Sequence, residues 1–175
     1  MYGGVTYRSR LESQWARFFD AMGWPFVYEP FDLNGWIPDF ALQFHEPLLV
    51  EVKPALTVED TLQHRVRIDR SGWNKEALIV GVDLPLLAKT EEYTSHLDRV
   101  PVIGLLKEVG FGWAPAGMFW CDGCSQPSIL SCTGSFTCRN CGSDYGDSHI
   151  NTGNEERFVG AWRACKNASQ WFSNP

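Results

Sequence analysis

The chain has 175 residues, enough for one sizeable hydrophobic core with a small appended module, and its 44% hydrophobic and 14% aromatic content excludes a disordered protein. No apolar run approaches the roughly eighteen residues of a membrane span, and the first residues lack the hydrophobic segment of a secretory signal, so we expect a cytoplasmic protein. The net charge of −6 argues against a broad, charge-driven grip on DNA, which depends on Lys and Arg side chains that neutralise phosphates.

Helix and strand patterns alternate along the first hundred residues. Ser9 is typical of a helix N-cap, and apolar residues then recur at helical spacing until Gly23 ends the helix. Strands are predicted over 26–29, 39–44, 48–53, 77–82 and 100–107, and helices over 58–71 and 154–172. This order predicts an α/β fold in which a mixed sheet is flanked by helices.

The strands at 39–44 and 48–53 are joined by a short turn, which predicts a hairpin. Side chains alternate across a strand, so residues 48, 50 and 52 would face a core while residues 49, 51 and 53 share the opposite face. Asp39 opens the first strand and Glu51 lies near the end of the second. Antiparallel pairing would therefore bring both carboxylates to one edge of the sheet, with Lys53 beside Glu51.

Such a group can bind a divalent metal ion. Carboxylate oxygens are the ligands that Mg²⁺ prefers, and Lys53 would hold or activate a water molecule. Taken singly, Asp39 also fits a strand-entry residue, and Glu51 with Lys53 fits an exposed ion pair worth less than about 1 kcal/mol. We favour a metal site because packing explains poorly why three charged groups converge on two otherwise apolar strands.

Pro38-Asp39 followed by Glu51-Val52-Lys53 resembles the core motif of the PD-(D/E)XK nuclease superfamily, over roughly the first hundred residues. The resemblance implies a restriction-endonuclease-like core in which Asp39, Glu51 and the backbone carbonyl of Val52 bind Mg²⁺ or Mn²⁺. It also implies that Lys53 serves the attacking water. The implied activity is that of an endonuclease hydrolysing DNA phosphodiester bonds to 5′-phosphate and 3′-hydroxyl ends.

Two further features concern that activity. Superfamily members commonly carry a glutamate on the first helix, and Glu12 stands at that place. The resemblance implies that Glu12 is a catalytic residue that assists a metal or its water shell, although Ser9 to Glu12 also fits a capping box. The segment after Lys53 is rich in basic side chains, which would contact phosphates beside the cut or form a solvated helix face. The predicted nucleic-acid contacts are Gln63, Arg65, Arg67 and Arg70.

Two Cys-x-x-Cys pairs, separated by thirteen residues, match a zinc ribbon in which four thiolates surround one structural Zn²⁺. The predicted ligands are Cys121, Cys124, Cys138 and Cys141. Cys132 and His149 are outside candidates if one of these fails, and Cys165 on the last helix is expected to be a small buried residue. The absence of a secretory signal favours metal over disulfides.

The predicted organisation is a nuclease core over 1–115, a zinc-ribbon insertion over 116–150 and a helix within 151–175 that returns to the core. The alternative is a binding module: the ribbon would bind nucleic acid or a protein partner, and the nuclease-like core would be inactive. The sequence leaves open whether the substrate is duplex, single-stranded or branched DNA, or RNA, and it does not set the oligomeric state.

Overall fold

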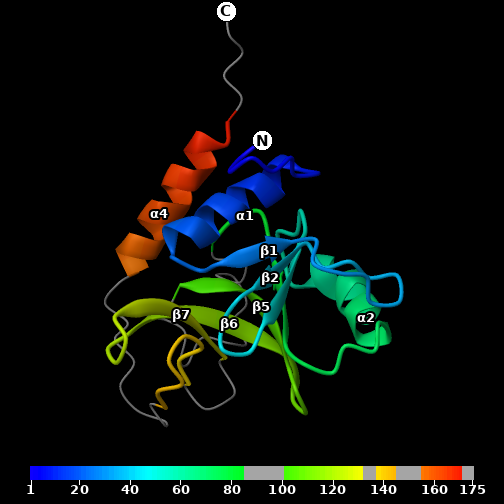
Figure 1. Ribbon diagram of the computed structural model, residues 1–175. Coiled ribbons are helices and arrows are strands. Elements are labelled where there is room, and N and C mark those ends of the chain that lie inside the picture. The colour runs from blue at the N-terminus through cyan, green and yellow to red at the C-terminus, as the bar shows by residue number, and fades with distance from the viewer. Residues whose placement is uncertain (85–100, 132–136, 145–154, 171–175) are drawn as a thin grey trace, which may run out of the picture.

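The computed structural model describes residues 1–84, 101–131, 137–144 and 155–170. In these residues the chain forms an α/β fold with a seven-stranded sheet and three α-helices (Figure 1). The strands, in their order across the sheet, are β1 (Phe26–Tyr28), β2 (Phe40–Leu42), β3 (Leu48–Val52), β4 (Ala77–Val80), β5 (Val102–Glu108), β6 (Gly112–Cys121) and β7 (Gln126–Ser131). The helices are α1 (Arg10–Ala21), α2 (Leu62–Arg70), which follows a 3₁₀ turn (Glu59–Thr61), and α4 (Glu155–Ala168).

The sheet is mixed, as predicted. Strands β3 and β4 run parallel, and every other neighbouring pair is antiparallel. A parallel pair needs a crossover connection, and here the crossover contains α2. Helices α1 and α4 lie together over one face of the sheet, whereas α2 lies apart from them (Figure 1). The sheet is therefore covered by helices from both sides.

Strand β3 shows the alternation that the sequence predicts. Leu48, Val50 and Val52 belong to the large core cluster that includes the α1 side chains. Leu49 belongs to a second cluster with Ile68 of α2. Both faces of this strand are buried, which explains why it reads as an almost continuous apolar run.

Helix α1 begins as the sequence predicts, because the side chain of Ser9 accepts a hydrogen bond from the backbone N–H of Glu12 at 3.1 Å. Its aromatic face packs on α4, with the rings of Trp15 and Trp162 only 4.3 Å apart between centroids. Cys165 of α4 is buried in the same cluster, as expected. The last helix therefore returns to the core.

Strands β6 and β7 were not predicted, and β6 crosses the boundary drawn between residues 115 and 116. Both strands pair in the main sheet beyond β5. Strand β5 approaches β4 so closely that only glycine fits at position 104, because a Cβ on Gly104 would lie 2.1 Å from the carbonyl oxygen of Ile79.

Several predicted positions lie outside the described residues: Cys132, His149, residue 100 of the predicted strand 100–107, and residues 154, 171 and 172 of the predicted last helix. Among the helices of the described segments, none has both the length and the hydrophobicity needed to cross a membrane.

Asp83, in the loop after β4, joins this loop to α4, and we expect the contact to contribute to stability. Asp83 accepts hydrogen bonds from the indole N–H of Trp162 at 2.6 Å and from Lys166 at 2.7 Å. Trp162 is 1% exposed, so Asp83→Ala leaves a buried donor without this partner, and we expect it to lower the free energy of unfolding by about 1–2 kcal/mol in urea denaturation. Lys166→Met, which removes only an exposed ion-pair partner, should cost well under about 1 kcal/mol. Equal losses in the two variants would contradict this assignment.

The same contact has a pH signature. Burial alone would raise the pKa of Asp83, but the hydrogen bonds from Lys166 and Trp162 outweigh it and lower that pKa below its ordinary value. A depressed carboxylate pKa gives stability that is present above the unfolded-state value of about 4 and is lost as the pH falls through the folded-state value. The difference in the free energy of unfolding between the wild type and Asp83→Ala, measured by urea denaturation at a series of pH values, should therefore become smaller below about pH 4.

Candidate active site and cysteine cluster

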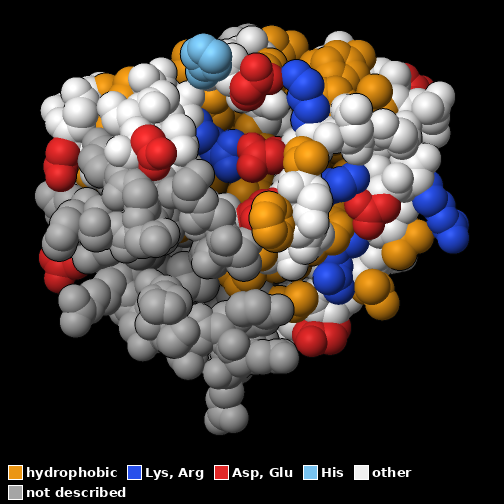
Figure 2. All heavy atoms as spheres, turned by 90° about the horizontal axis from the view of Figure 1, so that it is seen from below, with side chains coloured by type: hydrophobic (Ala, Val, Ile, Leu, Met, Phe, Trp, Pro, Cys, Tyr) orange, Lys and Arg blue, Asp and Glu red, His pale blue; other side chains and the backbone are white. Residues whose placement is uncertain are grey.

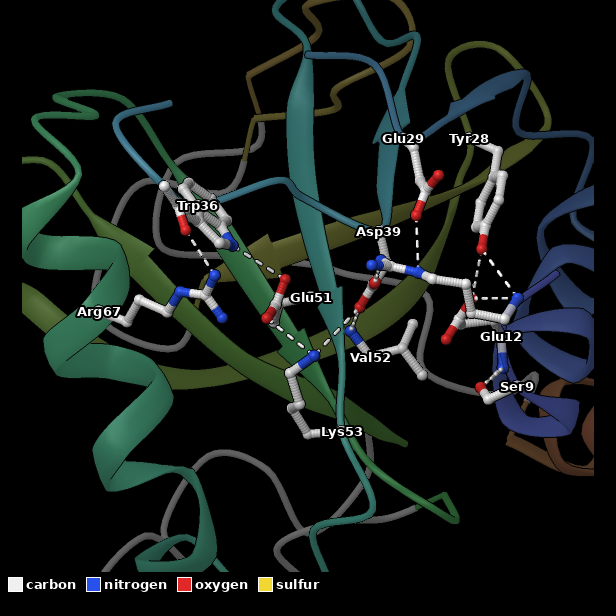
Figure 3. Close-up of polar contacts among 12 residues, drawn as sticks. Ser9, Glu12, Tyr28, Glu29, Trp36, Asp39, Glu51, Val52, Lys53 and Arg67 are labelled. Atoms are coloured by element: carbon white, nitrogen blue, oxygen red, sulfur yellow. Dashed lines mark hydrogen bonds and ion pairs between the residues drawn. The ribbon is translucent and has the colours of Figure 1, made fainter. Parts of the chain in front are cut away.

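The predicted carboxylates meet at one end of the β2–β3 hairpin (Figure 3). Asp39 directly precedes β2, Glu51 lies in β3, and each is 2% exposed. Phe40 pairs with Val50, so Asp39 falls opposite the end of β3, where Oδ2 of Asp39 accepts the backbone N–H of Val52 at 2.7 Å. The structure brings the amide of Val52 to the site, and the role of its carbonyl stays a prediction.

Lys53 bridges the two carboxylates. Its Nζ lies 2.8 Å from Oε1 of Glu51 and 3.5 Å from Oδ2 of Asp39. The Lys53 side chain is 21% exposed, compared with 3% for each carboxylate side chain. The amine therefore sits at the solvent side of a buried acidic pair, where it can contact a bound molecule.

The acidic pair is electrostatically costly. Burial raises the pKa of Asp39, and the nearby negative charge of Glu51 adds to the increase, while Lys53 and the Val52 amide oppose it; the resulting pKa is about 6. Two ionised carboxylates at this position repel each other where water solvates them poorly. Their oxygens fit a hard divalent cation, which would reduce this repulsion.

In the described part of the chain, no hydrogen bond or ion pair joins Glu12 to Asp39 or Glu51. Its Oε2 accepts the hydroxyl of Tyr28 at 2.6 Å and the backbone N–H of Arg8 at 3.1 Å. Burial and the bond to Glu12 raise the pKa of Tyr28 to about 12, so this hydroxyl keeps its proton and donates. The capping box is therefore half realised: Ser9 caps the helix, but the Glu12 carboxylate turns to Arg8 and Tyr28.

Arg8 is a member of the site that the sequence does not indicate. One guanidinium nitrogen lies 2.8 Å from Oδ1 of Asp39, and Nε lies 2.6 Å from Oε1 of Glu29. Arg8 comes before α1 and is 31 residues from Asp39, so no local pattern joins them. Through this side chain the helix that carries Glu12 is connected to the carboxylate pair.

Trp36 is the second such residue. It is 1% exposed, and its indole N–H donates to Oε2 of Glu51 at 2.9 Å. The preceding carbonyl, that of Gly35, accepts a hydrogen bond from Arg67 of α2. Trp36 thus fixes one oxygen of Glu51 while Lys53 contacts the other.

The four residues predicted to contact nucleic acid lie on α2. Arg67 is bonded to the Gly35 carbonyl, so at least one of its nitrogens serves the protein itself. Gln63 lines a pocket of about 630 Å³ that also includes Lys53 and His64. Arg70 is exposed and Arg65 is partly buried. Their contact with nucleic acid stays a prediction.

The four cysteines form a compact cluster. Their sulfur atoms all lie within 4.8 Å of one another, with 3.7 Å between Cys121 and Cys141 and 3.8 Å between Cys124 and Cys138. A tetrahedral zinc with Zn–S distances of about 2.3 Å places its sulfurs about 3.8 Å apart. The cluster could therefore hold a zinc ion with little rearrangement.

Both cysteine pairs lie in turns of the same kind. The N–H of Ser125 donates to the carbonyl of Cys121 at 2.8 Å, and the N–H of Gly142 donates to the carbonyl of Cys138 at 2.8 Å. Ser125 and Gly142 both have left-handed backbone angles, with φ of 55° and 72°. The hydroxyl of Ser143 lowers the pKa of Cys141 to about 6, which favours its thiolate, whereas burial raises the pKa of Cys138 and that of Cys124, the latter to about 12.

The cluster is anchored at the end of the sheet away from Asp39. Arg139, inside the second cysteine pair, forms two hydrogen bonds with the Glu76 carboxylate just before β4. Its carbonyl accepts the N–H of His45 in the β2–β3 turn at 3.1 Å.

The described part of the face seen in Figure 2 mixes acidic, basic and hydrophobic side chains, so it has no broad basic area for phosphates.

Comparison of the chain with protein-family models, with curated proteins and with solved structures found no match in any of the three.

The cysteine geometry generates a metal prediction. We expect purified protein to contain about one zinc per chain by elemental analysis, and Cys138→Ser to lose it with local unfolding, because Cys138 is 1% exposed and its turn packs on β7 and β4. Cys165→Ser removes a buried thiol outside the cluster and should keep the zinc. Natively folded wild-type protein without zinc would contradict the assignment.

Proposed function

We propose that the chain is a metal-dependent deoxyribonuclease that cuts phosphodiester bonds at the Asp39–Glu51–Lys53 site. The observation that carries the proposal is the pair of 2%-exposed carboxylates with one lysine amine reaching both. A folded core rarely buries two acids together without a compensating function, since the desolvation of each charge is costly. The order of these residues along the hairpin also matches the PD-(D/E)XK pattern.

The residues of the site divide the chemistry between them. Asp39 and Glu51 would hold Mg²⁺ or Mn²⁺ through carboxylate oxygens, with Trp36 and the Val52 amide fixing the orientation of the two groups. The bound cation would stabilise the negative charge that grows on the phosphate during hydrolysis. Lys53 would hold the attacking water in line with the scissile bond, and Glu12 would accept a hydrogen bond at the outer side of the site.

We also propose that the cysteine cluster holds a structural zinc. Four thiolates would fill the tetrahedral sphere, which leaves no position for a catalytic water. The zinc would stabilise the β6–β7 hairpin and its contact with Glu76 rather than take part in hydrolysis.

The alternative, a zinc-ribbon binding module with an inactive core, fits the cysteine cluster equally well. What favours an enzyme is the hairpin: a module that only binds has no need for Lys53 between two buried acids. The acidic net charge and the mixed surface of Figure 2 also argue that contact with nucleic acid is confined to a small area.

The first test uses labelled duplex, single-stranded, branched and RNA substrates with Mg²⁺ or Mn²⁺. We expect cleavage by the wild type and a loss of roughly 100-fold or more in both Asp39→Asn and Lys53→Met, because each removes a group at the reacting centre. Lys166→Met makes the same lysine change on α4 and should cut normally.

Three results would be informative in that experiment. Circular dichroism and urea unfolding should show that both inactive variants are folded. Undiminished cleavage in both would reject the site. If the wild type cuts no substrate with either ion, yet binds one of the nucleic-acid substrates in a gel-shift assay, the result would favour the binding module.

A second test concerns the orientation of Glu51. Trp36→Phe keeps most of the buried ring but removes the N–H that contacts Oε2, so we expect the Mg²⁺ concentration for half-maximal cleavage to rise roughly 10-fold. Trp24→Phe is a matched control, because Trp24 is equally buried and donates to the Pro127 carbonyl instead. The same Mg²⁺ requirement in both variants would show that the Trp36 bond does not position Glu51.

A further inference from the structure

The guanidinium of Arg8 lies against the Asp39 carboxylate, on one side of the candidate metal site. Asp39 has two oxygens: Oδ2 receives the Val52 amide and faces Lys53, and Oδ1 faces Arg8 at 2.8 Å. A cation bound at Oδ1 would place a second positive charge close to the guanidinium. Repulsion between the two charges would weaken the contact of Arg8 with this oxygen.

The charges around Arg8 favour such a replacement. The network contains four acids and two bases, with Glu12 joined through the backbone N–H of Arg8 and the others through side chains, which leaves a formal charge of −2 when all are ionised. They are Glu12, Glu29, Asp39 and Glu51 against Arg8 and Lys53. A divalent cation matches that remaining charge, and its arrival would repel the two bases.

Arg8 is also the partner with the most freedom to leave. Its side chain is 56% exposed, compared with 21% for Lys53 and 3% for Asp39. It lies before the Ser9 cap and outside α1, while its backbone N–H stays bonded to Glu12 and Tyr28. The guanidinium can thus rotate outward while the backbone at Arg8 remains fixed.

We infer that Arg8 is a positioning residue with two places: on Asp39 without the cation, and on a phosphate of bound nucleic acid when the cation has replaced it. This inference rests on the proposed function. A guanidinium binds phosphate with two parallel hydrogen bonds. Arg8 and Lys53 contact the two oxygens of the same Asp39 carboxylate, so a released guanidinium would be close to a strand placed at Lys53. Arg8 then weakens metal binding alone but strengthens nucleic-acid binding.

The first readout is binding of Mn²⁺ to the zinc-loaded full chain without DNA, measured by electron paramagnetic resonance. Arg8→Gln should bind Mn²⁺ about threefold to tenfold more tightly than the wild type, because a competing positive charge is gone. A purely structural role for Arg8 would give the opposite result, since loss of a scaffold contact weakens binding. Arg10→Gln removes an exposed arginine two residues away, at the start of α1, and should leave Mn²⁺ affinity unchanged.

The second readout is DNA affinity with Ca²⁺, titrated with salt. Arg8→Gln should bind DNA several-fold more weakly and reduce the slope of log K against log salt by about 0.9, the value for one lost phosphate contact. Arg8→Lys should recover part of the affinity. Unchanged or weaker Mn²⁺ binding in Arg8→Gln, or an unchanged salt slope, would overturn the inference while leaving the nuclease proposal intact. Absence of Mn²⁺ binding in both wild type and Arg8→Gln would overturn both.

Discussion

The candidate site depends on the hydrogen bond from the Val52 amide to the Asp39 carboxylate. This bond continues the contact between the two strands past their last paired residues, Phe40 and Val50. It therefore holds the Asp39 carboxylate at this end of the hairpin. Once Asp39 is placed there, the alternation of β3 sets Glu51 on the α2 side and leaves Lys53 at the strand end. A one-residue slip of β3 would exchange its faces and separate these groups. The same register therefore builds the core and the site.

Buried acids at a strand end need support from other parts of the chain. Arg8 reaches Asp39 from the segment before α1, and Trp36 reaches Glu51 from the loop that Arg67 holds on α2. Each carboxylate thus has a contact from a different side of the sheet in addition to Lys53. The raised pKa of Asp39 indicates that Lys53 and the Val52 amide only partly compensate for burial and for the charge of Glu51. A scaffold that keeps such a residual cost is typical of sites prepared for a ligand.

The sequence predicts the parts of the fold that follow from local periodicity. The Ser9 cap, the α1 stripe, the hairpin and the two faces of β3 all depend on neighbours within a few residues, and the structure confirms them. Arg8 and Trp36 could not be assigned because their partners lie 31 and 15 residues away. Strands β6 and β7 were missed for another reason. Each contains a proline, at positions 115 and 127, and proline normally argues against a paired strand.

The cysteine cluster and the carboxylate site lie at opposite ends of the same two strands. Arg139 contacts the β2–β3 turn and the residue before β4, whereas Glu51 and Lys53 lie at the far ends, where the Lys53 amide donates to Val80. The Arg139–Glu76 pair is mostly enclosed, with side chains 14% and 32% exposed, so removing either charge would leave the other poorly solvated. A metal-filled cluster would thus fix where β3 and β4 begin, and Arg8 and Trp36 fix where β3 ends. Because separate contacts hold the two ends, loss of the cluster should loosen the sheet without directly altering the bonds around Asp39 and Glu51.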